Sequence, residues 1–157
     1  MNKEPTYLGS VSAVAGSSLT VELAPQVNSG LLIIGGKTHR VGQVGSFVRI
    51  TQGYNNLYGL IAETSESSSF DQIGDTHQTD RRWIKIELVG ETIGDEFERG
   101  INQYPSINDE AHLVVESDLR KIYGGADSGQ IVVGTLSSSD SIKVSIDLDK
   151  LVTRHSA

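Results

Sequence analysis

Apolar and polar residues alternate with a period of two in several parts of this chain. The alternation is clearest over residues 19–23, 84–88 and 142–148, where Leu, Ile or Val occupies every second position. A segment of this kind turns one face to a core and the other to water. These three segments are therefore predicted to be half-buried β-strands.

Shorter apolar runs predict further strands, in GLLIIGG, SFVRI, LYGLIAE, HLVVE and QIVVGTL. Turn-forming residues separate the predicted strands, as in AGSS, YNN and SSSDS. Evenly spaced short strands with such turns are typical of a closed antiparallel barrel or a β-sandwich. Helical periodicity is scarce, so the fold is predicted to be mainly all-β.

One short helix is predicted near residues 117–123, within ESDLRKIYGG. Ser117 is a favourable N-cap, and Gly124 can adopt the left-handed conformation that ends many helices. The apolar residues that would share one face are Leu119, Ile122 and Tyr123. The longest polar interruption, residues 63–80, holds too few apolar residues to pack by itself, so we expect an exposed and mobile loop there.

Composition narrows the possible functions. The chain has 157 residues, the size of one domain, and its 13 basic and 20 acidic residues give a net charge of −7. This balance disfavours broad contact with a nucleic-acid backbone. The absence of cysteine excludes disulfides and thiolate metal sites. No apolar run approaches the roughly 20 residues of a membrane helix, and the N-terminus lacks a signal-peptide core, so a cytoplasmic location without membrane contact is expected.

Gly36-Lys37-Thr38 matches only the end of a phosphate-binding loop. The complete motif has a glycine five positions before this one and opens a helix, but Leu31 stands at that position and no helical pattern follows. A hairpin turn is the favoured interpretation. The glycine-rich segment 123–130 has no lysine beside its glycines and follows the predicted helix, so it is interpreted as a helix end and connection.

No catalytic, cofactor-binding or metal-ligating residue is predicted. No pair with i, i+4 spacing and no ligand cluster occurs among the histidines, which are His39, His77, His112 and His155. His77 lies between Asp75 and Asp80, where a stray metal ion could bind, but a solvated loop is favoured. No serine lies in a Gly-x-Ser-x-Gly elbow, and a small hydrolase that uses loop Asp and His residues therefore ranks last.

Basic residues surround Trp83, the only tryptophan of the chain. Arg81, Arg82 and Lys85 could form, with this ring, a platform for single-stranded nucleic acid. The net charge of −7 and the lack of a second such cluster favour instead a place for Trp83 at a barrel edge or interface. A free-standing small β-barrel that binds single-stranded nucleic acid is kept as the alternative function.

Three long motifs occur in a characteristic order: YLGSVSAVAGSSLTVEL, VGQVGSFVRITQGYNNLYGLIAE and FERGINQYPSINDEAHLVVESDLRKIYG. The first two resemble the opening hairpins of the HAS-barrel, the N-terminal β-barrel of HerA-type hexameric ATPases and of rotary ATP synthase subunits. The third, with its Phe-x-x-Gly, its Tyr-Pro and its strand before a short helix, is most similar to HerA itself. The resemblance implies a small antiparallel HAS-like barrel over residues 1–150.

The segment IVVGTLSSSDSIKVSIDLDKLVTRHSA resembles the approach to the ATPase core of that family, where Arg-His-Ser-Ala precedes the nucleotide-binding loop. Residues 151–157 are therefore expected to begin the strand that leads into a P-loop ATPase domain beyond Ala157. The Walker motifs and the sites for ATP and Mg would lie in that domain. The resemblance thus implies an N-terminal fragment that is not itself an enzyme and holds no cofactor.

HerA relatives are hexamers that translocate DNA, and their barrels form a collar on the ring. The resemblance implies that this chain helps to assemble the hexamer and docks an effector, either a NurA-like or other nuclease or, in bacterial anti-phage defence systems, a sirtuin-like NAD hydrolase. DNA would be bound only by the missing ATPase ring. Aromatic residues beside turns are the predicted partner contacts, because such side chains supply much interface energy. They are Tyr54, Tyr58, Phe70, Trp83 and Tyr104.

Overall fold

The computed structural model describes residues 4–27, 30–68, 80–94, 96–124, 129–136 and 139–153. The chain divides into two compact units, Met1–Val114 and Val115–Ala157. Each unit has its own architecture, and the mainly β character predicted from the alternation is confirmed for the chain as a whole.

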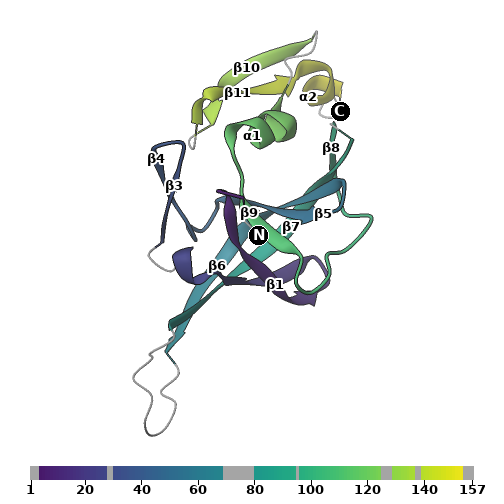
Figure 1. Cartoon of the computed structure of the whole chain (residues 1–157). Helices are drawn as coiled ribbons and strands as arrows, with labels where there is room; N and C mark the ends of the chain where they lie inside the picture. Colours follow the sequence, from purple (N-terminus) through teal and green to yellow (C-terminus); the bar gives the residue numbers. More distant parts are fainter. Residues whose placement is uncertain are drawn as a thin grey trace, which may run out of the picture. The chain divides into compact units, whose positions relative to one another are not determined.

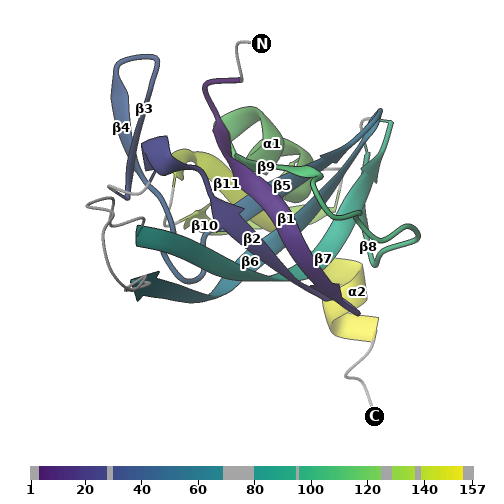
Figure 2. The same cartoon turned by 60° about the horizontal axis from the view of Figure 1, so that its bottom comes forward.

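The first unit is a closed antiparallel β-barrel (Figures 1 and 2). Its strands pair in the ring order β2-β1-β9-β5-β6-β7, and pairing of β2 with β7 closes the ring. The short strand β8 (Glu96–Arg99) adds to β7 outside the ring. The ring strands are β1 (Tyr7–Ala15), β2 (Ser18–Leu23), β5 (Phe47–Gln52), β6 (Asn55–Ser68), β7 (Asp80–Ile93) and β9 (Glu110–Leu113).

The clean alternation of two predicted strands produces the seam that closes the barrel. Leu19 of β2 lies opposite Ile86 of β7, and Val21 lies opposite Ile84. All four side chains are buried in one apolar cluster, to which β1, β5 and β9 also contribute, while the intervening residues of β2 lie nearer the surface. Because the side-chain period of a strand is two, the same pattern that predicted these strands also fixes their register.

The Gly36-Lys37-Thr38 segment lies in a hairpin, as predicted. Strands β3 (Leu31–Ile34) and β4 (Lys37–Arg40) pair through a two-residue turn, Gly35-Gly36. Both glycines have positive φ, 55° and 78°, which is the conformation that tight hairpin turns of this length require. No helix follows the turn, so the segment lacks the helix N-terminus on which a phosphate-binding loop depends.

The strands on either side of the predicted loop 63–80 extend further than expected. Strand β6 continues to Ser68, and β7 begins at Asp80, so that only residues 69–79 separate them. Residues 63–66 are Glu-Thr-Ser-Glu, which offer no apolar face but pair across the strands with residues 82–85 of β7. Residues 69–79, and Phe70 with them, lie outside the described residues.

The second unit contains the hairpin of β10 (Gln130–Leu136) and β11 (Ser139–Asp147), and the helices α1 (Glu116–Tyr123) and α2 (Leu148–Thr153). Helix α1 confirms the helix predicted near residues 117–123. Leu119 of α1 and Ile142 of β11 are buried. The strands of the barrel all precede residue 114.

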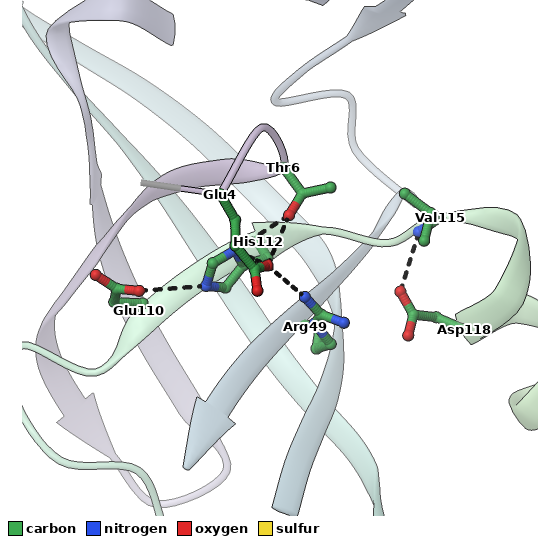
Figure 3. A network of polar contacts seen from close by, with 7 residues as sticks. All are labelled: Glu4, Thr6, Arg49, Glu110, His112, Val115 and Asp118. Atoms are coloured by element: carbon green, nitrogen blue, oxygen red, sulfur yellow. Dashed lines mark hydrogen bonds and ion pairs between the residues drawn. The ribbon is translucent and has the colours of Figure 1, made fainter. Parts of the chain in front are cut away.

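The two predicted caps of α1 were wrong. The N-cap is Val115 and not Ser117, and its backbone N–H donates to the carboxylate Oδ2 of Asp118 at 3.1 Å (Figure 3). Gly124 has φ −70°, so it is not left-handed. A glycine is needed there because a Cβ would collide with the backbone carbonyl oxygen of Arg120.

Residues 148–153 form α2, where the resemblance implied a strand from residue 151. Asp149 lies in the first turn of this helix, where a negative charge is favourable to the helix dipole. Residues 154–157 lie outside the described residues. Within the described parts of the chain, neither α1 nor α2 has the length and apolar character needed to cross a bilayer.

Candidate docking surface

Two loops at one end of the barrel line an open polar hollow. One is the turn between β5 and β6, and the other is the connection from β8 to β9 over residues 100–109. The hollow has a volume of about 350 Å³. The residues that line it are Gln52, Gly53, Asn55, Gln103, Ser106 and Asp109.

The β5–β6 turn follows directly from the local sequence. Gln52 and Asn55 lie opposite each other in the ladder, so Gly53 and Tyr54 form a two-residue hairpin turn. Gly53 has φ +57°, a backbone conformation that residues other than glycine rarely adopt. Tyr54 is consequently held at the tip of the hairpin, where it is fully exposed.

Side-chain hydrogen bonds tie the second loop to the first. The Nε2 of Gln52 donates to the backbone oxygen of Tyr104 at 2.9 Å and to Oδ2 of Asp109 at 3.1 Å. The same carboxylate oxygen accepts the backbone N–H of Ser106 at 2.7 Å. At the start of the loop, the backbone N–H of Asn102 donates to Oε1 of Glu91 at 3.0 Å. The loop is therefore anchored at its start and at its end.

Tyr54 and Tyr104, two of the predicted partner contacts, lie on the two loops that line this hollow. Tyr54 is 102% exposed and Tyr104 is 52% exposed, and Gln52 joins their two loops. The neighbouring Ile107 is also largely exposed. We call Tyr54, Tyr104, Ile107 and the hollow between the loops the loop-end surface. It combines exposed aromatic and aliphatic groups with amide donors and acceptors, the mixture found at protein interfaces.

Tyr58 does not belong to this surface, and its prediction as a partner contact is corrected. Its side chain is 0% exposed. The ring of Phe97 on β8 packs against it edge to face, with ring centroids 5.9 Å apart. Gly90 makes this possible, because a Cβ at that position would strike the Phe97 ring. Tyr58 is thus a packing residue between the barrel wall and β8.

The remaining predicted contacts lie elsewhere. Trp83 is half-buried within β7, between Glu22 of β2 and Ser65 of β6 in the ladders. On either side of it, Arg82 forms an ion pair with Glu66 at 3.2 Å, and Arg81 approaches Glu22 at 3.8 Å. These acidic partners neutralise much of the basic character on which the nucleic-acid interpretation depended. Phe70 is outside the described residues.

A second polar group surrounds His112, a buried residue of β9 (Figure 3). Its Nδ1 lies 3.2 Å from Oγ1 of Thr6 and 3.5 Å from Oε2 of Glu4, and its Nε2 lies 3.6 Å from Oε2 of Glu110. The Glu4 oxygen also accepts from Arg49 of β5 at 3.3 Å. This arrangement, the His112 cluster, connects the segment before β1 with β5 and β9.

Burial lowers the pKa of His112 below its ordinary value of 6.5, because the imidazolium form loses hydration. The positive charge of Arg49 lowers the pKa further, whereas Glu4 and Glu110 raise it and only partly offset the other two. No local sequence pattern indicates this cluster, since Glu4, Arg49 and His112 are far apart in the chain. Among the described residues, no group of three or more His, Asp or Glu side chains has a geometry that could hold a metal ion.

Comparison with known proteins adds no family assignment: no protein-family model matches this chain, and no curated protein gives a significant sequence match.

Proposed function

We propose that this chain is a non-catalytic assembly and docking domain of a HerA-like ATP-dependent DNA translocase. In this proposal the barrel belongs to a collar on a hexameric ring and binds an effector, either a nuclease or an NAD hydrolase. The observation that carries the docking role is the loop-end surface, where exposed Tyr54 and Tyr104 lie on the two loops that line one polar hollow of a closed barrel.

Three further features support the proposal. A closed barrel is a rigid support without open sheet edges in its ring, so loops on it can be held in place for a partner. The order of the three long motifs resembles the HAS-barrel over most of the chain. The net charge of −7 suits contact with a protein better than contact with a phosphate backbone.

The docking role is tested by measuring affinity for the nuclease or NAD hydrolase encoded beside the gene for this chain. Tyr54→Ala and Tyr104→Ala are each expected to weaken binding by about tenfold or more, because aromatic residues at an interface centre contribute at least about 1.4 kcal/mol. Val44→Ala is the control, since Val44 is an exposed apolar residue of the barrel unit that does not line the hollow. Equal affinity of all three variants and the wild type would refute docking at this surface.

The alternative function, binding of single-stranded nucleic acid, is tested with the same preparation. Fluorescence anisotropy with a labelled oligothymidine at low salt should show no binding if the chain is a protein-docking domain. Binding that weakens steeply as salt rises would favour the alternative, because release of counterions drives such association. Loss of that binding in Trp83→Ala would then place it at β7.

A further inference from the structure

A buried carboxylate of β7 is hydrogen-bonded to the loop that carries Tyr104. Glu91 is 3% exposed, and in the ladder between β6 and β7 it stands opposite Leu57, a fully buried core residue. An apolar side chain is usual at such a position, because a carboxylate loses its hydration when it is buried. Hydrogen bonds must replace that hydration, so the partners of Glu91 indicate what the residue does.

Both hydrogen bonds that the Glu91 side chain accepts within the described residues come from Asn102. The backbone N–H of Asn102 donates to Oε1 at 3.0 Å, and its side-chain Nδ2 donates to the same oxygen. Ile101, the preceding residue, packs against the apolar cluster of the barrel, whereas Asn102 is exposed. The carboxylate of Glu91, and not burial, therefore fixes Asn102 in place.

Tyr104 lies between two such attachments. Asn102, two residues before it, is held by Glu91, and the backbone oxygen of Tyr104 accepts from Nε2 of Gln52 at 2.9 Å. The side chain of Tyr104 remains 52% exposed. An exposed side chain on a fixed backbone can meet a partner at a low cost in conformational entropy, because the loop is already ordered before binding.

We propose that Glu91 is a positioning residue of the loop-end surface: its carboxylate holds residues 102–104 in one conformation and so presents Tyr104 to a partner. The use of this loop for docking rests on the proposed function, but the attachment of the loop does not. Glu91 is buried, so it acts through Asn102 and does not itself touch the partner. Removal of the carboxylate should release the loop without weakening the barrel, since leucine suits the buried site and water can bind the exposed Asn102.

The test combines amide hydrogen exchange of the 157-residue chain with urea unfolding. Glu91→Leu should speed exchange at residues 102–106 by about tenfold or more, because the loop loses hydrogen bonds to a charged group, while the free energy of unfolding stays equal or rises. Glu91→Gln should keep the exchange of the wild type, since its amide oxygen can accept both bonds. Asn102→Asp should speed exchange as Glu91→Leu does, because two carboxylates repel each other.

Glu98→Leu is the matched control, because Glu98 stands opposite Glu91 in the ladder on β8 and is exposed. It should exchange like the wild type. The exposed site of Asn102 keeps the inference testable even where Glu91→Leu does not fold. Unchanged exchange in the variants at positions 91 and 102 would overturn the inference. So would exchange in Glu91→Gln as fast as in Glu91→Leu, or an acceleration spread over the whole barrel, because Glu91 would then be a packing residue only.

Affinity for the effector separates this inference from the proposed function. Glu91→Leu is expected to bind more weakly than the wild type, but less weakly than Tyr104→Ala, since it keeps the ring. Weaker binding of Tyr104→Ala with unchanged binding of Glu91→Leu would refute the positioning role and leave the docking function standing. Unchanged binding of both Tyr54→Ala and Tyr104→Ala would refute docking at this surface, while hydrogen exchange would still decide whether Glu91 holds the loop.

Discussion

At the scale of single residues, the local sequence predicts exposure beside a turn, but it does not predict which distant residues cover a side chain in the fold. Tyr54 and Tyr104 lie beside turns and are exposed, as their neighbours in the sequence indicated. Tyr58 also follows a turn, yet it is buried because Phe97, 39 positions later, covers the outer face of its strand. The sequence gives no local sign of such cover. No histidine or ligand cluster lies near His112 in the sequence. In the fold, polar partners of its ring come from the segment before β1 as well as from β9 itself.

The environment of His112 predicts a pH-dependent stability. Because its pKa is lower in the folded chain than in the unfolded chain, the unfolded chain binds more protons between the two values. Stability is therefore fully present above about 6.5 and declines as the pH falls from there through the lowered pKa. Arg49 opposes protonation, while Glu4 and Glu110 favour it and limit the decline.

The measurement is the free energy of urea unfolding at several pH values from weakly alkaline to weakly acidic. His112→Gln should show a smaller decline than the wild type over the same range, because its side chain does not titrate. The difference between the two curves removes the contributions of the other histidines. Parallel curves would show that His112 keeps its ordinary pKa in the folded protein.

At the scale of secondary-structure elements, strands with alternating apolar residues can be predicted from the sequence, whereas helix caps and very short helices cannot. The alternating segments 19–23 and 84–88 predicted strands β2 and β7. In the structure these two strands pair with each other and close the barrel. Helix α1 was found from its apolar face, but its caps depend on backbone geometry that Ser117 and Gly124 do not reveal. The helix α2 was missed because six residues with Leu148, Leu151 and Val152 fit a strand or a helix equally well.

The cover that β8 provides over the barrel wall predicts effects of very different size for substitutions at two tyrosines. Tyr58→Ala should destabilise the barrel by about 3 kcal/mol, because it empties the space against Phe97. Tyr54→Ala should change stability by less than about 0.5 kcal/mol, since the side chain is at an exposed tip. Urea unfolding of both variants measures this difference, and equal destabilisation would contradict the packing described for Tyr58.

At the scale of the whole molecule, the sequence predicted an all-β chain with a barrel or a sandwich, and the structure is a closed barrel followed by a separate unit. The division could not be seen in the sequence, because no polar or glycine-rich linker marks the passage from β9 to α1 at Val114 and Val115. Alternation in β11 looked like one more barrel strand. Period-two patterns show that a strand has two different faces, but they do not show which sheet it joins.

The central claim, that this barrel is a docking collar of a DNA-translocating ring, is tested most directly by native mass spectrometry of the product of the complete reading frame, purified together with its proposed effector. The account predicts that the frame continues past Ala157 into a Gly-rich loop with Lys-Ser or Lys-Thr, and that the mass corresponds to a hexamer with effector bound. A frame that ends at Ala157, or a product that neither forms a six-chain ring nor retains the effector, would contradict it.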